Sequence, residues 1–321
     1  MSQPFLIDTD VGSDDAVALM MALRSPVADV IAITTVSGNV PVGQATTNAL
    51  IVNELCGVDV PVYPGAAKPL LRPYVDATFF HGVDGLGDQN YPQPQQRPQE
   101  MHAVDAIIKT AKNTPGLVIV TLGPLTNLAL AIQKAPEIIP NIARCVVMGG
   151  AACTYGNVTA AAEYNIWVDP DAARITFLSG LEIEMVGWEL CKDEYALTPD
   201  EIAHVRSLDT PYGHFAVDCN ITAIEAFKRQ TGQIGLSLPD PVTMAVALDP
   251  SIVTDSSKHY VDVEIHSDLT RGMTVVDRLN VAKDPRNATT WKQVLDTEKP
   301  ISVTWSVDVR RWKKMLYGLL S

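Results

Sequence analysis

Short apolar runs alternate with helix-type patterns through the first half of the 321-residue chain, and this alternation limits the folds that it can adopt. The apolar runs occupy residues 5–8, 30–35, 60–63, 117–121, 145–148 and 183–186. The helical patterns occupy residues 14–24, 43–56, 103–112, 125–133 and 170–179. Strands that are apolar on both faces are buried between layers of helices, which is typical of parallel sheets. The sequence therefore predicts an α/β fold with a mainly parallel, Rossmann-like sheet flanked by helices.

The second half of the chain is less regular. We expect helices at residues 198–207, 211–230 and 308–320, and strands at 260–266, 273–277 and 302–306. This pattern predicts an irregular, mixed C-terminal part. The segment 89–100 is rich in Gln and Pro and is expected to be a surface loop. Because no internal repeat and no linker divides the chain, residues 1–321 are predicted to form a single domain.

Charge and cysteine content argue against several kinds of partner. The chain has 37 acidic and 24 basic residues, and its formal net charge of −13 would repel phosphate backbones and anionic membranes. Five scattered cysteines form no CxxC pair, which favours reduced thiols over disulfide bonds or a zinc site. The sequence has no signal-peptide pattern and no apolar run near the roughly 18 residues of a membrane span. We therefore expect a cytoplasmic protein that binds neither nucleic acid nor membranes.

Residues 8–16, Asp-Thr-Asp-Val-Gly-Ser-Asp-Asp-Ala, carry four carboxylates at the point where the first strand gives way to a helix. Ligands gather at the carboxyl ends of the strands in such sheets. Asp8, Asp10, Asp14 and Asp15 would repel one another or take up protons unless a cation neutralises them. Oxygen donors alone suit a hard ion, Ca²⁺ or Mg²⁺. A simpler interpretation is that Asp14 and Asp15 cap the helix while Asp8 faces solvent.

Two known acidic motifs fit this segment less well. An EF-hand loop would need Gly and Glu where Ser13 and Leu19 stand, and a helix in place of the preceding strand. A phosphohydrolase of the haloacid dehalogenase type also places Asp-x-Asp after its first strand and uses Mg²⁺. Thr121 would serve its second motif, but no matching Lys or later acidic pair follows. A Mg²⁺-dependent phosphohydrolase therefore stays as the alternative enzyme.

The segment 8–16 closely resembles the N-terminal signature of the calcium-dependent nucleoside hydrolases, the inosine-uridine hydrolase family. Further matching segments follow in the family's order, among them Thr-Thr-Val-Ser-Gly-Asn at 34–39 and Gly-Pro-Leu-Thr-Asn at 123–127. The others lie at residues 148–150, 156–159, 162–165 with 169–170, and 240–241 with 249–250. The resemblance thus extends from about residue 5 to residue 250 and covers most of the chain.

The resemblance implies hydrolysis of the N-glycosidic bond of ribonucleosides to free base and ribose. It implies Ca²⁺ ligands in Asp10, Asp15, Asp240 and the carbonyl of Leu122, with Asp10 also acting as general base on a water held by the calcium ion. Asp8 would orient its neighbours. The residues implied for the sugar are Asp14, Asn39, Asn157, Glu163 and Asn165 on the hydroxyls, and Met148 against the ring. Such carboxylates would stabilise the oxocarbenium-like charge that develops on the sugar.

Spacing agrees with the sugar assignment at one place. Glu163 and Asn165 are one residue apart, so that an extended segment would point both side chains to the same side. The resemblance also implies a small-molecule nucleoside substrate and a homodimer or homotetramer. It does not select a nucleobase.

The chain departs from the family pattern at Pro239. The best-known branch has a His there, directly before the metal-binding Asp, which helps to protonate the leaving base. Three readings follow: another proton donor, stacking of the base on aromatic rings, or loss of catalysis that leaves a riboside-binding protein. The candidate donors are His81 and His214, and the candidate aromatic residues are Phe79, Phe80, Trp188 and Phe227.

Overall fold

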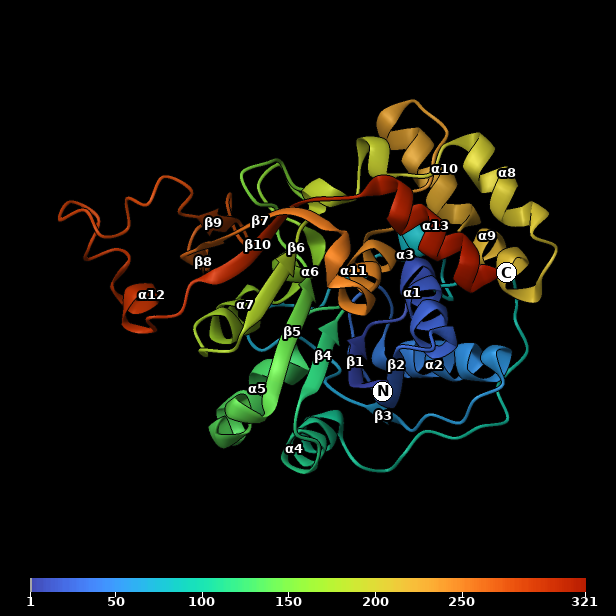
Figure 1. Cartoon of the computed structure of the whole chain (residues 1–321), viewed down its shortest axis with the longest axis horizontal. Coiled ribbons are helices and arrows are strands. Elements are labelled where there is room, and N and C mark those ends of the chain that lie inside the picture. The colour runs from blue at the N-terminus through green and yellow to red at the C-terminus, as the bar shows by residue number, and fades with distance from the viewer. Residues whose placement is uncertain (1) are drawn as a thin grey trace.

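The computed structural model describes residues 2–321 and is organised around one eight-stranded sheet (Figure 1). Its strand order is β3-β2-β1-β4-β5-β6-β10-β7, and the β10–β7 pair is antiparallel while the other neighbours are parallel. The strands are β1 (Gln3–Thr9), β2 (Ala28–Thr35), β3 (Val62–Pro64), β4 (Leu117–Thr121), β5 (Ile142–Met148), β6 (Ile183–Val186), β7 (Val253–His259) and β10 (Ile301–Val307). The predicted fold class is confirmed. The edge strand β7 was missed because most of its side chains are exposed and polar, without an apolar run.

Helices cover both faces of the sheet because successive strand residues point to opposite sides. In β1, Phe5 and Ile7 join one apolar cluster and Leu6 joins the other. The first cluster includes residues of α1 (Ser13–Arg24), α2 (Val42–Cys56), α11 (Pro239–Leu248) and α13 (Val309–Leu320). The second includes residues of α4 (Ala103–Asn113), α5 (Thr126–Lys134) and α7 (Pro170–Phe177). The buried strands are therefore sandwiched, as their continuous hydrophobicity predicts.

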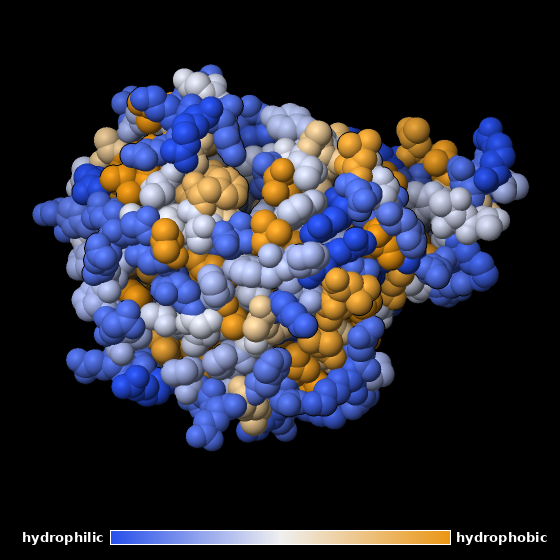
Figure 2. All heavy atoms as spheres, turned by 180° about the vertical axis from the view of Figure 1, so that it is seen from behind, coloured by the Kyte–Doolittle hydropathy of each residue, from blue (hydrophilic) through white to orange (hydrophobic). Residues whose placement is uncertain are grey.

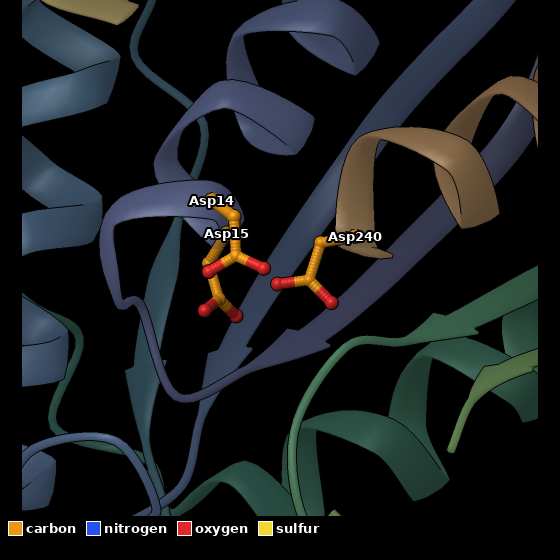
Figure 3. Close-up of side chains that lie close together, drawn as sticks. All are labelled: Asp14, Asp15 and Asp240. Carbon is orange, nitrogen blue, oxygen red and sulfur yellow. The ribbon is translucent and has the colours of Figure 1, made fainter. Parts of the chain in front are cut away.

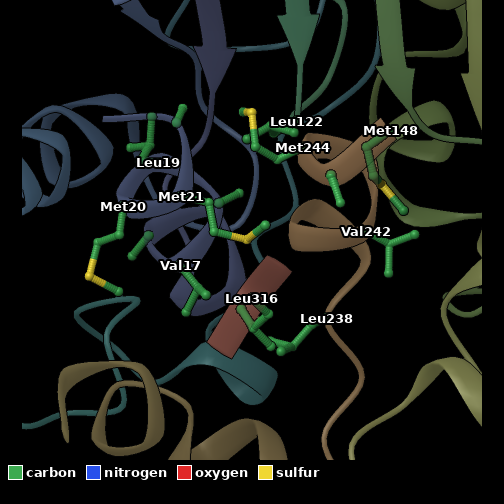
Figure 4. Close-up of a cluster of buried hydrophobic side chains, with 14 of the residues drawn as sticks. Val17, Leu19, Met20, Met21, Leu122, Met148, Leu238, Val242, Met244 and Leu316 are labelled. Atoms are coloured by element: carbon green, nitrogen blue, oxygen red, sulfur yellow. The ribbon is translucent and has the colours of Figure 1, made fainter. Parts of the chain in front are cut away.

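One helix pair within the first cluster positions the site. Helices α1 and α11 pack against each other through buried aliphatic and methionine side chains, among them Met21, Val242 and Met244 (Figure 4). Burial of this apolar surface drives the contact. As a result, the first turns of two helices that are far apart in the sequence lie together at the carboxyl end of the sheet.

The remaining elements of the chain are short. They are α3 (Thr78–His81), α6 (Tyr164–Val168), α8 (Pro199–Ser207), α9 (Pro211–Asp218), α10 (Ile221–Thr231), α12 (Lys292–Asp296), the antiparallel pair β8 (Val261–Val263) and β9 (Thr274–Val276), and four 3₁₀ turns (Pro136–Asn141, Trp188–Leu190, Asp193–Tyr195 and Pro250–Ile252). The expected helix at 211–230 is in fact two helices. They are separated at Asn220, whose side chain donates hydrogen bonds to the carbonyls of Ser13 and Ala216. The strands expected at residues 260–266 and 273–277 are shorter in the structure, where they are β8 and β9.

The structure agrees with the expected surface loop and the expected free thiols. Segment 89–100 forms no helix or strand and is mostly exposed. All five cysteines carry free thiols. Within residues 2–321, no helix combines the length and the hydrophobicity that a membrane crossing requires. The part of the chain that carries β8, β9 and α12 projects from the body, at the left in Figure 1 and at the right in the reverse view of Figure 2, where apolar side chains are visible on it.

Candidate active site

Three aspartates meet where α1 and α11 begin. Asp14, Asp15 and Asp240 each offer a carboxylate oxygen, and these oxygens lie within 4.8 Å of one another (Figure 3). Asp14 and Asp15 lie in the first turn of α1, and Asp240 lies in the first turn of α11. Free backbone amides and the helix dipole favour negative charge at such positions. The fold thus concentrates carboxylates at two helix N-termini.

Asp10 joins this group from the end of β1. Its Oδ2 accepts a hydrogen bond of 2.6 Å from the backbone amide of Asn39, while its Oδ1 is buried without a partner. Two glycines surround this carboxylate: a Cβ on Gly38 would overlap Oδ2, and a Cβ on Gly123 would lie 2.7 Å from Oδ1. The chain therefore uses glycines from the ends of β2 and β4 to admit a charged side chain into a closed space.

Asp15 and Asp8 are fixed by hydrogen bonds. Asp15 accepts from the hydroxyl of Thr9, from the amide of Gly12 at 2.8 Å and from the side chain of Asn39 at 3.0 Å. It therefore caps α1 and also belongs to the acidic group. Asp8 is fully buried and accepts from Thr34 and Asn127 at 2.6 and 2.8 Å, so it does not face solvent as the simpler interpretation required.

Burial and mutual repulsion shift the protonation of the cluster. Desolvation, and then the charge of Asp15, raise the pKa of Asp14 to about 7 and hold the pKa of Asp10 well above its usual range. The pKa of Asp240 is raised in the same way by burial and by the neighbouring aspartates. In Asp14, as in Asp10, Oδ1 is buried without a hydrogen-bond partner. Unsatisfied oxygens on crowded carboxylates are the donor set of a hard cation.

The residues expected to bind the sugar line one cavity beside this cluster. They are Asp14, Asn39, Met148, Asn157, Glu163 and Asn165, and the cavity also reaches Leu122 and Asp240. Its open space, including solvent at the mouth, is about 690 Å³. The structure thus brings together residues that are spread over most of the chain. None of the lining residues within the described part of the chain is a Lys or Arg.

Glu163 and Asn165 reach the cavity from a helix terminus and not from an extended segment, so that expectation was wrong. Glu163 caps α6: its carboxylate accepts from the amides of Asn165 and Gly150 at 2.8 and 2.9 Å. Asn165 lies within α6, and its Nδ2 donates to the carbonyl of Leu122 at 2.8 Å. Burial raises the pKa of Glu163 to about 7.

A second group of lining residues is aromatic and comes from other elements. Phe79, Phe80 and His81 of α3 line the cavity, together with Trp188. Phe79 is 63% exposed, whereas His81 is 6% exposed. Burial lowers the pKa of the His81 imidazole to about 3, so the ring is neutral.

The other leaving-group candidates lie elsewhere. Phe227 is half-buried on α10 beside Gly235 and is not among the lining residues, and His214 pairs with Asp209 at the surface. Gln230, also on α10, lines the cavity instead, as do Ser237 and Pro239. No motif marks Gln230 or Ser237, so neither residue can be singled out from the sequence. Only the packing of α10 reveals which of its residues face the cavity.

Comparison with known proteins identifies the family. The family model described as inosine-uridine preferring nucleoside hydrolase matches residues 5–310. A pyrimidine-specific ribonucleoside hydrolase RihA of a Shewanella species is 39% identical over 292 residues, which are 90% of this chain and 91% of that protein. A plant nucleoside hydrolase, PpNRh1, has a TM-score of 0.92 at 34% identity and covers 100% of this chain and 99% of its own. A purine-preferring ribonucleoside hydrolase from Gardnerella vaginalis has a TM-score of 0.86 at 34% identity, with 99% of both chains covered.

The chain belongs to the inosine-uridine preferring nucleoside hydrolase family. The resemblance inferred from the sequence and the assignment to a hydrolase that acts on nucleosides are therefore confirmed. Nothing in the comparisons favours the phosphohydrolase. The names of the Shewanella and Gardnerella relatives specify different bases, although both describe ribonucleoside hydrolases.

Proposed function

We propose that this chain hydrolyses the N-glycosidic bond of ribonucleosides to free base and ribose, with Asp10 as the general base. The observation that carries the proposal is the unpartnered, buried Oδ1 of Asp10, which lies in an acidic cluster beside the cavity. Burial and the charge of Asp15 raise the pKa of Asp10, which makes its carboxylate a stronger base. The glycines around it leave no room for another side chain there.

We further propose Ca²⁺ as the cofactor, held by the carboxylates of Asp10, Asp15 and Asp240 and by the carbonyl of Leu122. The oxygen-only donors and the unsatisfied Oδ1 of Asp10 fit a hard cation. When bound, Ca²⁺ supplies positive charge that orients a water molecule and makes it easier to deprotonate. Asp14 belongs to the same oxygen cluster and also lines the cavity, so we assign it to the sugar.

The chain's own groups then act on the two sides of the scissile bond. The oxygen of water bonds to C1′ of ribose while its proton passes to Asp10. The C1′–N bond breaks, and its electron pair stays on the base, which in net gains one proton. Asp14 and Glu163 stabilise the positive charge that develops on the sugar. Asn39, Asn157, Asn165 and Met148 orient the ribose by lining its site.

On the leaving-group side we propose His81 as a hydrogen-bond donor to the base. Pro239 lines the cavity but has no side-chain donor, whereas His81 lines the same cavity and is neutral. Phe227 contributes indirectly at most, through the packing of α10. Because relatives with different base names each match at least 90% of this chain, we propose ribonucleosides as the substrate class without a single base.

The remaining sequence-based expectations stay as proposals. A single domain over residues 1–321 is supported by β10, which pairs with β6 inside the same sheet as β1. A cytoplasmic location is supported by the free thiols. A homodimer or homotetramer is supported by the projecting segment, where Leu269 and Leu279 are 85% and 82% exposed.

The test is release of reducing sugar from inosine, adenosine, guanosine, uridine and cytidine, with Ca²⁺ and with a chelator. We expect release that requires both Ca²⁺ and Asp10 and falls by about 10²–10⁴-fold in Asp10→Asn. Asp277→Asn is the matched control, because Asp277 is also buried and hydrogen-bonded but holds the loop at Val281 and Ala282. Phosphate release from p-nitrophenyl phosphate, or ligand binding without turnover, would replace the proposal by one of its alternatives.

A further inference from the structure

The imidazole of His81 is held by the first residue of α1. Its Nδ1 lies 3.3 Å from the backbone nitrogen of Ser13 and 3.0 Å from the Ser13 hydroxyl oxygen. A backbone N–H can only donate, so Nδ1 must accept. An accepting Nδ1 carries no proton, and a neutral imidazole then carries its single proton on Nε2. The contact therefore determines the tautomer as well as the position of the ring.

The backbone of Ser13 is in turn held by a hydrogen bond from another residue. Its carbonyl accepts a hydrogen bond of 3.2 Å from the side chain of Asn220, which is fully buried between α9 and α10. The Ser13 amide belongs to the first turn of α1, where backbone donors have no partner within the helix. The ring of Phe80 packs edge-on against His81, with 5.0 Å between the centroids. These contacts restrict how the side chains of Ser13 and His81 can move relative to each other.

The other edge of the ring faces the cavity. His81 is a lining residue, and within residues 2–321 its Nε2 makes no hydrogen bond. We propose that Ser13 is a positioning residue that fixes His81 as the Nε2–H tautomer, so that His81 presents a hydrogen-bond donor to the departing base. This inference rests on the proposed function for its catalytic consequence. The tautomer itself does not depend on turnover.

The Ser13 hydroxyl opposes a competing interaction between His81 and Asp14. Oδ1 of Asp14 lies 3.7 Å from Nδ1 of His81 and has no partner of its own. A proton on Nδ1 would satisfy this carboxylate, but it would leave Nε2 as an acceptor that repels the electron-rich leaving base. The hydroxyl and the amide of Ser13 together oppose that tautomer. Removal of the hydroxyl weakens the opposition, while the amide remains.

The tautomer is tested by ¹⁵N NMR of the full chain labelled at its six histidines, with and without Ca²⁺. The signals of His81 are assigned by their loss in His81→Gln. We expect a protonated Nε2 and an unprotonated Nδ1 in the wild-type chain. Ser13→Ala should give a detectable Nδ1–H population or averaged shifts, and Ser13→Thr should restore the wild-type signals. An Nδ1–H tautomer in the wild-type chain, or unchanged shifts in Ser13→Ala, would overturn the inference.

The catalytic consequence is tested by comparing two substrates that differ in their leaving group. Ser13→Ala should lower kcat on the best nucleoside by about tenfold, the size expected for one lost hydrogen bond, and leave p-nitrophenyl riboside nearly unchanged because that leaving group needs no donor. His81→Gln retains an amide donor, so its kcat on the nucleoside should be higher than that of His81→Phe. Equal losses on both substrates would indicate a merely structural role and contradict the proposal. A wild-type chain without turnover, but with the expected shifts, would refute the proposed function and leave the assignment of the tautomer intact.

Discussion

Two groups of residues meet at the cavity, called here the acidic end and the base end, and they are built in different ways. The acidic end consists of Asp10, Asp14, Asp15 and Asp240, and each of these residues is at most 6% exposed. It stands on strand ends and on the first turns of two packed helices. The base end consists of Phe79, His81, Trp188 and Gln230. It stands on the four-residue helix α3, a 3₁₀ turn and the end of α10, and Phe79 is mostly exposed.

This difference separates what the sheet imposes from what surface elements add. A carboxylate cluster at the carboxyl end of a parallel sheet cannot be moved without disturbing the core beneath it. Elements outside the sheet can change their side chains at little cost to stability. Nucleoside hydrolases that match this chain over nearly its full length differ in the base in their names, as expected if the base end varies on a constant acidic end.

The largest effect should come from a change at the acidic end. Asp15→Asn removes a proposed Ca²⁺ ligand and leaves the cap of α1 in place, since an amide oxygen can accept from Gly12. We expect kcat/KM to fall by about 10²–10³-fold, the scale found when one preorganised electrostatic group is removed. Phe79→Ala, at the other end, should cost less than about tenfold because most of that ring is in water. Ribose release measured at several Ca²⁺ concentrations checks both numbers.

A comparable loss of kcat/KM in Asp15→Asn and Phe79→Ala would contradict the expected difference between the acidic end and the base end. Thermal unfolding of both variants in chelator is the control for folding. If Asp15→Asn recovers full activity at high Ca²⁺, the residue contributes affinity for the metal and little else.

The two ends also differ in what the sequence could predict. Asp10, Asp14 and Asp15 follow an apolar strand, so their location at the site followed from the strand's carboxyl end alone. Asp240 was found through the family resemblance, because only the packing of α11 on α1 brings it there. At the base end, Phe227 and Gln230 are three residues apart on α10, and no periodicity says which of them faces a ligand. His81 was a candidate donor, but its tautomer depends on a contact with Ser13 that is invisible in the sequence.

An intermediate effect should appear in the pH dependence of stability. Burial raises the pKa of Asp8 to about 6, and burial with the charge of Asp15 raises that of Asp14 to about 7. These folded-state values exceed the usual value for Asp in an unfolded chain, about 3.9. The metal-free native state therefore binds more protons than the unfolded state between about pH 4 and pH 7. Its stabilisation by these protons is complete below that window and is lost as the pH rises through it.

In chelator, the free energy of unfolding should fall from pH 5 to pH 8, by about 1.4 kcal/mol per pH unit for each proton retained. With Ca²⁺ the decrease should be smaller, because the charge of a cation bound by the neighbouring Asp15 and Asp240 lowers the pKa of Asp14. Urea unfolding at both pH values and in 0.5 M salt checks this, since salt screens the net charge at the surface more than buried groups. A rise in stability with pH in chelator would mean that the cluster is charged without a metal.

The smallest effect is expected at the base end and would sharpen the contrast. The Gln230 amide lines the cavity and can both donate and accept hydrogen bonds. Gln230→Ala should lower kcat/KM for the best base by about fivefold, mainly through KM, because a hydrogen bond to bound substrate adds uniform binding. The same variant should reduce the ratio of kcat/KM between the best and the worst base. It should leave the Ca²⁺ requirement unchanged. Gln233→Ala is the matched control, since Gln233 is exposed nearby but does not line the cavity. If Gln230→Ala instead lowers kcat for every base equally, the amide supports the position of His81 and not the choice of base.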